Sequence, residues 1–210
     1  MEIGSCWKDY AEVNSLLFDV NLEVKMFYCF DYYPWAILKE IDRNHYTDNM
    51  KKSIMMMDFK IKPEDCKNNL SKKIDKEIAI EYFKNKLLQN DFDNTTIFVA
   101  APSLSISSES YDNRFELLFK GFDNVIFLEA QKSVRSSHKS IDNRRRAPEI
   151  YENIKLPNSC PNKISKNVIL IDDIFTNGDT LKGTLQFLKE NFPKIENVTA
   201  LFFGITKHEL

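Results

Sequence analysis

The chain has 210 residues, of which 43% are hydrophobic and 12% aromatic, so it can bury the core of one domain, and a second independent domain is not expected. Its formal net charge of −2 argues against nucleic-acid binding by the whole surface, although a local basic cluster leaves such binding open. The four cysteines form no Cys-x-x-Cys pair, no apolar run reaches membrane-spanning length, and the N-terminus lacks a leader-like pattern. We therefore expect a cytoplasmic protein without a zinc ribbon, a disulfide framework or a membrane partner.

The first 46 residues are expected to form an accessory segment. Apolar residues alternate from Leu22 to Phe30, which predicts a strand, and the aromatic-rich stretch after it indicates burial against something else. We interpret residues 1–46 as an accessory layer that covers a core formed by residues 47–210.

Two helices are expected next. The first spans about residues 50–59 and ends before Pro63 and the polar residues after it. The second runs from about Leu70 to Leu88, with lysines on its solvent face. The apolar residues expected on its buried face are Ile74, Ile78, Tyr82, Phe83 and Leu87.

Strands and helices then alternate regularly. Strands are expected at residues 95–101, 124–129, 167–171 and 198–204, with a helix at 109–120. This alternation predicts parallel pairing with right-handed crossovers. Because ligands lie beyond the carboxyl ends of such strands, the loops after the first three of these strands are candidates for the site.

The most informative stretch is VILIDDIFTNGDTL, residues 168–181. Its four branched apolar residues are typical of a central strand buried on both faces, and we expect Asp172 and Asp173 to end that strand. A short polar turn comes next, and the spacing of apolar residues from Leu181 onward predicts a helix packed on one side of the sheet. The turn consists of Thr176, Asn177, Gly178, Asp179 and Thr180.

This strand, turn and helix predict a site for a phosphorylated ribose. The free amides of the first helical turn and the helix dipole attract an anion, and the hydroxyls of Thr176 and Thr180 can add donors. Asp172 and Asp173 repel a phosphate, so their partners are sugar hydroxyls or a hydrated divalent cation.

The stretch resembles the phosphoribosyl pyrophosphate (PRPP) signature of the type I phosphoribosyltransferases. That signature has a hydrophobic run, two acidic residues, two hydrophobic residues and Thr-Thr-Gly-x-Thr. Asn177 stands where a second Thr or Ser is usual, although its side chain still offers a donor. The order of elements is most similar to the ComF-like branch, without the N-terminal zinc-binding cysteines of many members. The resemblance implies an α/β fold with a mostly parallel five-stranded sheet flanked by helices, and a small N-terminal hood over the site.

The resemblance also implies an activity, the Mg²⁺-dependent transfer of phosphoribose from PRPP to a nitrogen base with release of pyrophosphate. Asp172 and Asp173 would hold the ribose hydroxyls or the metal, and residues 176–180 would hold the 5′-phosphate. The loop that would approach the pyrophosphate contains Ala101, Pro102 and Ser103. This loop has no basic residue before Arg114, so its side chains offer the pyrophosphate no cation.

A long basic stretch comes after the strand at 124–129. Residues 130–163 carry hardly any apolar residue before Ala147, which is typical of a lid or a disordered segment. Basic residues on a lid would neutralise a departing pyrophosphate, whereas the alternative is a solvated charged loop. The residues expected to act on the pyrophosphate are Lys132, Arg135, Arg144 and Arg146.

Two other functions stay open at this point. A PRPP- or nucleotide-sensing regulator would keep the pocket but transfer nothing. The lack of a basic residue in the loop at residues 101–103 favours this function. A nucleic-acid-associated factor would use the cluster from Arg144 to Arg146, since ComF-like proteins are associated with DNA uptake. The sequence names neither the acceptor base nor the oligomeric state, and a homodimer is one option.

Overall fold

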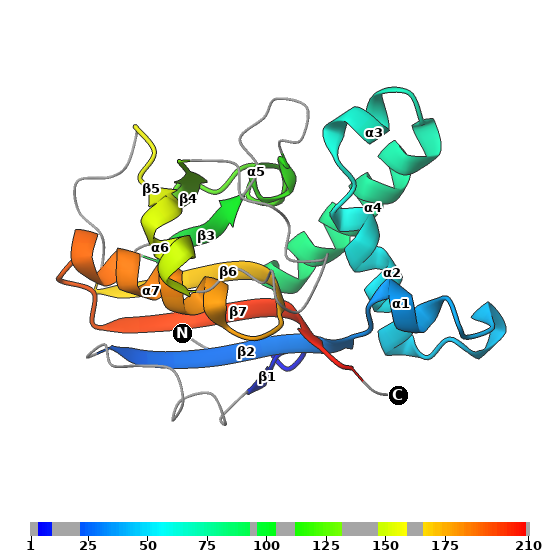
Figure 1. Cartoon of the computed structure of the whole chain (residues 1–210), viewed down its shortest axis with the longest axis horizontal. Coiled ribbons are helices and arrows are strands. Elements are labelled where there is room, and N and C mark those ends of the chain that lie inside the picture. The colour runs from blue at the N-terminus through cyan, green and yellow to red at the C-terminus, as the bar shows by residue number, and fades with distance from the viewer. Residues whose placement is uncertain are drawn as a thin grey trace.

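The computed structural model describes residues 4–9, 22–92, 96–103, 112–131, 147–158 and 166–208. These residues form a central sheet with helices on both of its faces (Figure 1). The α/β class and the mostly parallel sheet expected from the sequence are therefore confirmed.

The sheet has seven strands in the order β1-β2-β7-β6-β3-β4-β5. Its parallel strands are β2 (Glu23–Tyr32), β7 (Asn197–Thr206), β6 (Asn167–Phe175), β3 (Ile97–Ser103) and β4 (Val125–Ala130). Two short antiparallel strands, β1 (Lys8–Asp9) and β5 (Ile154–Lys155), form the edges. The expected number of five strands was too low because a two-residue strand has no periodicity that a sequence can reveal.

Strand β2 lies in the sheet and not in a layer above it. It pairs in parallel with β7, with Val24 opposite Val198, and the side chains of Val24, Met26 and Phe30 are buried. The expectation of an accessory layer was wrong for this strand. An alternating pattern predicts a strand with one buried face, but it does not identify the strand beside it.

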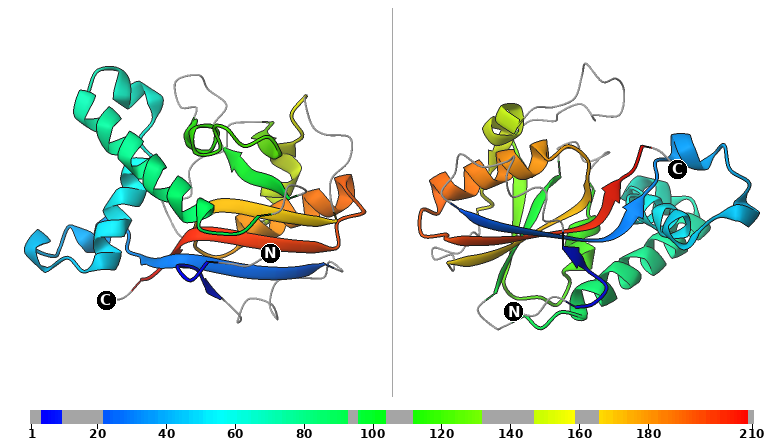
Figure 2. Two further views of the ribbon diagram at one scale, coloured as in Figure 1. Left: turned by 180° about the vertical axis from the view of Figure 1, so that it is seen from behind. Right: turned by 90° about the horizontal axis from the view of Figure 1, so that it is seen from below.

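Helices cover both faces of the sheet (Figure 2). On one face, α7 (Asp179–Asn191) and α6 (Ala147–Asn153) enclose a mainly aliphatic core. On the other face, α2 (Asp48–Phe59), α4 (Leu70–Leu88) and α5 (Arg114–Leu118) enclose an aromatic core. In that core, the ring centroids of Phe83 and Phe203 lie 4.5 Å apart. The strand interior at β6 is thus buried from both sides, as its apolar run predicts.

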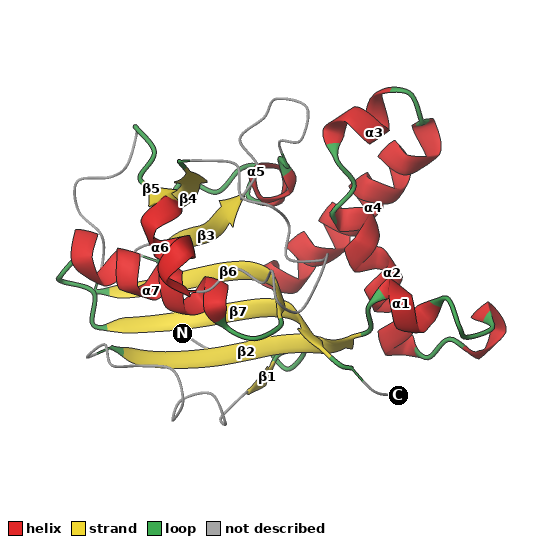
Figure 3. Cartoon of the chain, in the orientation of Figure 1, coloured by secondary structure: helices red, strands yellow, loops and turns green. Residues whose placement is uncertain are grey.

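A group of helices stands beyond the carboxyl ends of β2 and β7 (Figure 3). It contains α1 (Trp35–Leu38), the 3₁₀ turn η2 (Arg43–His45) and α3 (Pro63–Lys67), together with α2 and the first part of α4. As expected, α2 ends before Pro63, and Pro63 itself begins α3, because proline is well suited to the first turn of a helix. The division into residues 1–46 and 47–210 remains a prediction.

The helix predicted over Leu70 to Leu88 is confirmed with these bounds, but its buried face differs from the expected one. Phe83 and Leu87 are buried as expected, whereas Ile74 and Ile78 are 45% and 56% exposed. The first half of α4 extends past the sheet, so its apolar residues have no strand to cover them (Figure 1).

Candidate functional site

The winding of the chain reverses between β3 and β6. After β3 the chain continues to β4 on one side, and after β6 it continues to β7 on the other side. In sheets of this kind a crevice opens at the carboxyl ends of the two strands where the order reverses. Ala100 pairs with Ile171 as the last pair between β3 and β6, so the final residues of β3 leave β6 beside Asp172. The end of β3 and the acidic pair of β6 therefore lie beside each other.

Strand β6 runs through the acidic pair and ends at Phe175. The expectation that Asp172 and Asp173 end the strand was therefore wrong, because Ile174 and Phe175 continue the pairing with β7. The polar turn comes next, and α7 begins at Asp179. Gly178 precedes this helix with φ +82° and ψ 0°, a left-handed conformation that side chains disfavour and glycine adopts readily.

The polar turn leaves backbone donors at the start of α7. The helical ladder includes a bond from the Lys182 amide to the Gly178 carbonyl at 2.9 Å, so the amides before Lys182 have no partner within the helix. Asn177 Nδ2 donates to Asp179 Oδ2 at 2.6 Å, which ties that carboxylate to the turn. Thr176 Oγ1 lies 3.1 Å from Thr206 Oγ1 of β7. The turn thus has the amides and hydroxyls that an anion site uses.

The two adjacent aspartates have different surroundings. Asp172 Oδ1 accepts a hydrogen bond from the Asp173 amide at 2.8 Å. Desolvation, together with the charge of Asp173, raises the pKa of Asp172 to about 7. Asp173 is 6% exposed, and burial alone would raise its pKa, but the charges of Arg114 and Lys60 outweigh this effect and lower it.

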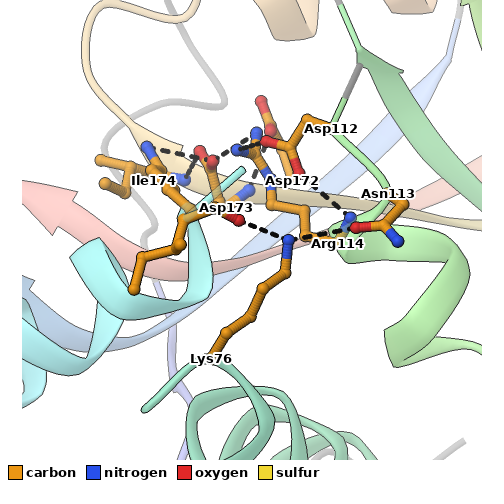
Figure 4. Close-up of polar contacts among 9 residues, drawn as sticks. Lys76, Asp112, Asn113, Arg114, Asp172, Asp173 and Ile174 are labelled. Atoms are coloured by element: carbon orange, nitrogen blue, oxygen red, sulfur yellow. Dashed lines mark hydrogen bonds and ion pairs between the residues drawn. The ribbon is translucent and has the colours of Figure 1, made fainter. Parts of the chain in front are cut away.

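Asp173 is the centre of a buried cluster of charges (Figure 4). Its Oδ2 atom lies 3.0 Å from Lys60 Nζ and 2.7 Å from Arg114 Nη2. Arg114 Nη1 in turn lies 2.5 Å from Asp112 Oδ2. Among the described residues, Asp172 has no ion pair, whereas Asp173 has two.

Two further residues border this cluster. The buried Lys76 donates to the carbonyl of Ile61 and, at 3.1 Å, to Asn113 Oδ1, and burial lowers the pKa of Lys76. Burial and the negative charge of Asp173 raise the pKa of Tyr32, the last residue of β2, to about 12. The phenol of Tyr32 therefore stays protonated and can serve as a hydrogen-bond donor at the end of the sheet.

The structure places only some of the predicted site residues. Asp172, Asp173 and the turn residues follow one another at the carboxyl end of β6 and the start of α7, and Ala101 and Pro102 are buried at the end of β3. Ser103 is the last residue of that strand, opposite Glu129. Four predicted residues lie outside the described part of the chain, namely Lys132, Arg135, Arg144 and Arg146.

Sequence reasoning missed the cations around Asp173. Lys60 and Lys76 stand among many lysines, and no local pattern distinguishes them. Arg114 offered one signal, since it is the first basic residue after β3, but its partner lies on a distant strand.

The acidic pair fits the Mg²⁺ ion that the resemblance implies only in part. Mg²⁺ is usually held by one or two carboxylates together with waters and substrate phosphates. Among the described residues, no group of three or more His, Cys, Asp or Glu side chains comes together. Asp172 can serve as one of the one or two carboxylates that hold Mg²⁺. Desolvation disfavours the charged form of its carboxylate, so a nearby cation would stabilise that form. Asp173 fits less well because two cations of the chain already hold it.

No protein-family model matches the chain. No curated protein matches it either. Among solved structures, it is similar to a xanthine-guanine-hypoxanthine phosphoribosyltransferase of Helicobacter pylori, at 13% identity and a TM-score of 0.36, over 64% of this chain and 84% of that one. It is also similar to a hypoxanthine phosphoribosyltransferase of Staphylococcus aureus, at 19% identity and a TM-score of 0.33, over 59% of each chain. Likenesses with TM-scores this low leave the activity of the chain undecided.

The described helices include no candidate membrane span. None of them, across the described parts of the chain, combines the length and the apolar character that crossing a bilayer requires.

Proposed function

We propose that the protein is a phosphoribosyltransferase that transfers phosphoribose from PRPP to a nitrogen base, with Mg²⁺ as its metal ion. The observation that carries the proposal is the position of Asp172, a partly buried carboxylate without an ion pair among the described residues, just before a glycine-capped helix at the reversal of strand order. Groups suited to a diol and to a phosphate are thereby a few residues apart at one crevice.

The 5′-phosphate of the sugar is assigned to the turn before α7. The amides at positions 180 and 181 and the helix dipole favour an anion there, with hydroxyls from Thr176 of the turn and Thr180 of the first helical turn. Gly178 allows the phosphate to approach the backbone closely because it has no side chain. Asn177 contributes by holding the Asp179 carboxylate through its amide, which limits the repulsion of the phosphate.

The ribose hydroxyls are assigned to Asp172. A charged acceptor gains more from a hydroxyl donor than a neutral one does. In the reaction, the bond between the anomeric carbon and a pyrophosphate oxygen breaks and its electron pair leaves with the pyrophosphate, while the base nitrogen forms a bond to that carbon and loses its proton. The sugar carries positive charge between these two events, and a carboxylate near it stabilises that charge.

The leaving pyrophosphate gains negative charge as its bond to the sugar breaks, so it needs cations. We assign this role to Lys132, Arg135, Arg144 and Arg146, which the basic composition of residues 130–163 supports. Mg²⁺, when bound, would neutralise oxygens of the pyrophosphate, and Asp172 is the residue that would hold it, with Asp173 as a weaker candidate. The end of β3, with Ala101, Pro102 and Ser103, would contact the pyrophosphate through its backbone.

The proposal is tested by mixing the protein with PRPP, Mg²⁺ and each common purine or pyrimidine base and measuring the release of pyrophosphate. The variant with Arg144→Ala and Arg146→Ala should lose transfer yet bind ribose 5-phosphate nearly as well as the wild type, since contacts to the leaving group act in the transition state. Asp65→Asn, at an exposed ion pair with Lys72, serves as a control that should keep full activity. A wild-type protein that binds neither PRPP nor ribose 5-phosphate in calorimetry would contradict the proposal.

One observation favours a second candidate, a PRPP- or nucleotide-sensing regulator. Ala101 and Pro102 are buried and offer no side-chain donor for a pyrophosphate. Binding of PRPP without release of pyrophosphate, for every base tested, would favour this second function. A ComF-like role with nucleic acid, homodimerisation and a cytoplasmic location remain predictions from the sequence.

A further inference from the structure

The guanidinium of Arg114 is held on several sides. One nitrogen pairs with Asp112 at 2.5 Å and another pairs with Asp173 at 2.7 Å, while the backbone amide of Arg114 donates to Asp112 Oδ1 at 3.0 Å. The rings of Phe59 and Phe115 lie 5.9 and 5.3 Å from its central carbon. The side chain is 19% exposed, so its position is set by the protein and not by solvent.

Stability alone does not account for this arrangement. Replacing a buried ion pair by apolar residues of similar volume is often neutral or stabilising, since both charges must be desolvated. The charged cluster around Asp173 also connects elements that lie far apart in the sequence. Asp112 and Arg114 come after the loop that leaves β3, Lys60 directly follows α2, and Asp173 belongs to β6 beside Asp172. Arg114 therefore links the start of α5 to the carboxyl end of β6.

Lys60 and Arg114 contribute differently to the hold on Asp173. The side chain of Lys60 is 29% exposed and ends in a single ammonium group on a flexible chain. The guanidinium of Arg114 is planar, packs against two phenylalanine rings and contacts two carboxylates at once. Because the two ends of one guanidinium reach both carboxylates at once, with a hydrogen bond to Asp112 and an ion pair to Asp173, a lysine at position 114 would keep the charge but lose one of the contacts.

We propose that Arg114 is a positioning residue of the phosphoribosyl site, which acts through Asp173. By pairing with Asp173 it fixes that carboxylate and the backbone of β6, and so leaves Asp172 as the carboxylate that faces the sugar. Asp173 Oδ1 also accepts the Ile174 amide at 2.5 Å, which connects the orientation of this side chain to the strand end that carries the phosphate turn. This inference rests on the proposed function only for the identity of the ligand.

The test compares Arg114→Lys with Arg43→Lys, a matched substitution at an exposed residue of η2. Calorimetry with Mg²⁺ measures the affinity for ribose 5-phosphate and for PRPP. Arg114→Lys should weaken both ligands by about tenfold or more, because the lost contact lies beneath the sugar site that both share. Arg43→Lys should leave both affinities unchanged. Loss of PRPP affinity alone would overturn the proposal, because it would make Arg114 a direct contact of the pyrophosphate, and unchanged affinities would overturn it as well.

A second variant distinguishes positioning from contact. If Arg114 acts through Asp173, adding Arg114→Lys to an Asp173→Asn protein should not weaken ribose 5-phosphate binding further, because coupled residues are not additive. An additional loss as large as that in the wild-type background would show that Arg114 acts independently of Asp173, and would refute the proposal.

A readout without ligand separates this inference from the proposed function. Hydrogen exchange of the Ile174 amide, followed by NMR, reports whether Asp173 keeps its orientation, and Arg114→Lys should speed that exchange by about tenfold relative to Arg43→Lys. If the wild type binds no phosphoribosyl ligand, the proposed function fails, whereas the exchange rate still decides whether Arg114 positions Asp173. Unchanged exchange would refute the positioning role whatever the ligand.

Discussion

The substitution Asp173→Asn should destabilise the fold far more than its size suggests. Asp173 is 6% exposed, and its Oδ2 atom lies within 3.0 Å of Lys60 and 2.7 Å of Arg114. Removing one partner of a buried ion pair typically costs about 3–5 kcal/mol, since the remaining charge stays desolvated. Lys60 can return to water and Arg114 keeps Asp112, so we expect the lower end of this range, about 3 kcal/mol. A domain with ordinary stability of about 5–15 kcal/mol would still fold.

The measurement is urea-induced unfolding at pH 8, followed by circular dichroism in the presence of a chelator. The control is Asp65→Asn, which removes the same charge from an ion pair with Lys72 whose side chains are both 46% exposed. An exposed pair contributes about 0–1 kcal/mol, so the control should stay within about 1 kcal/mol of the wild type. If the two variants differ by less than about 0.5 kcal/mol, within the additivity error of such measurements, the assigned role of Asp173 as the centre of a buried cluster is refuted.

Three further changes concern other contacts. The fold raises the pKa of Asp172 to about 7, so the folded state binds this proton more tightly than the unfolded state does. The stability that Asp172 contributes is complete below its unfolded pKa and is lost as the pH rises through about 7. In a chelator, the melting temperature of the wild type should therefore fall relative to Asp172→Asn between pH 4 and pH 8, and parallel curves would contradict this reasoning. Gly183→Ala should cost about 1–3 kcal/mol in urea unfolding, because a β-carbon there would lie 2.6 Å from the carbonyl oxygen of Ala147, and the exposed Gln186→Ala is the control. Burial raises the pKa of the Cys29 thiol, so iodoacetamide should label it at least about ten times more slowly in the native protein than in denaturant, and equal rates would refute this protection.

Several elements could be predicted from the sequence because they depend on contacts between near neighbours. The apolar run before Asp172 predicts a buried strand, and the spacing from Leu181 predicts the helix after it. The helix from Leu70 to Leu88 was likewise predicted with its observed bounds. The conformation of the polar turn at residues 176–180 was also local, since Gly178 takes a left-handed conformation where the motif has its glycine.

The tertiary structure alone decided which of these elements are neighbours. The alternating residues of β2 predict a strand, but only the fold pairs it with β7, and only the fold leaves Ile74 and Ile78 uncovered. The same holds for the candidate site, because Asp173 and Arg114 come from distant parts of the chain. A sequence records the charge of each of these residues, but the partner that lowers one pKa, or the burial that raises another, exists only once the chain has folded, because both depend on distance and on the exclusion of water.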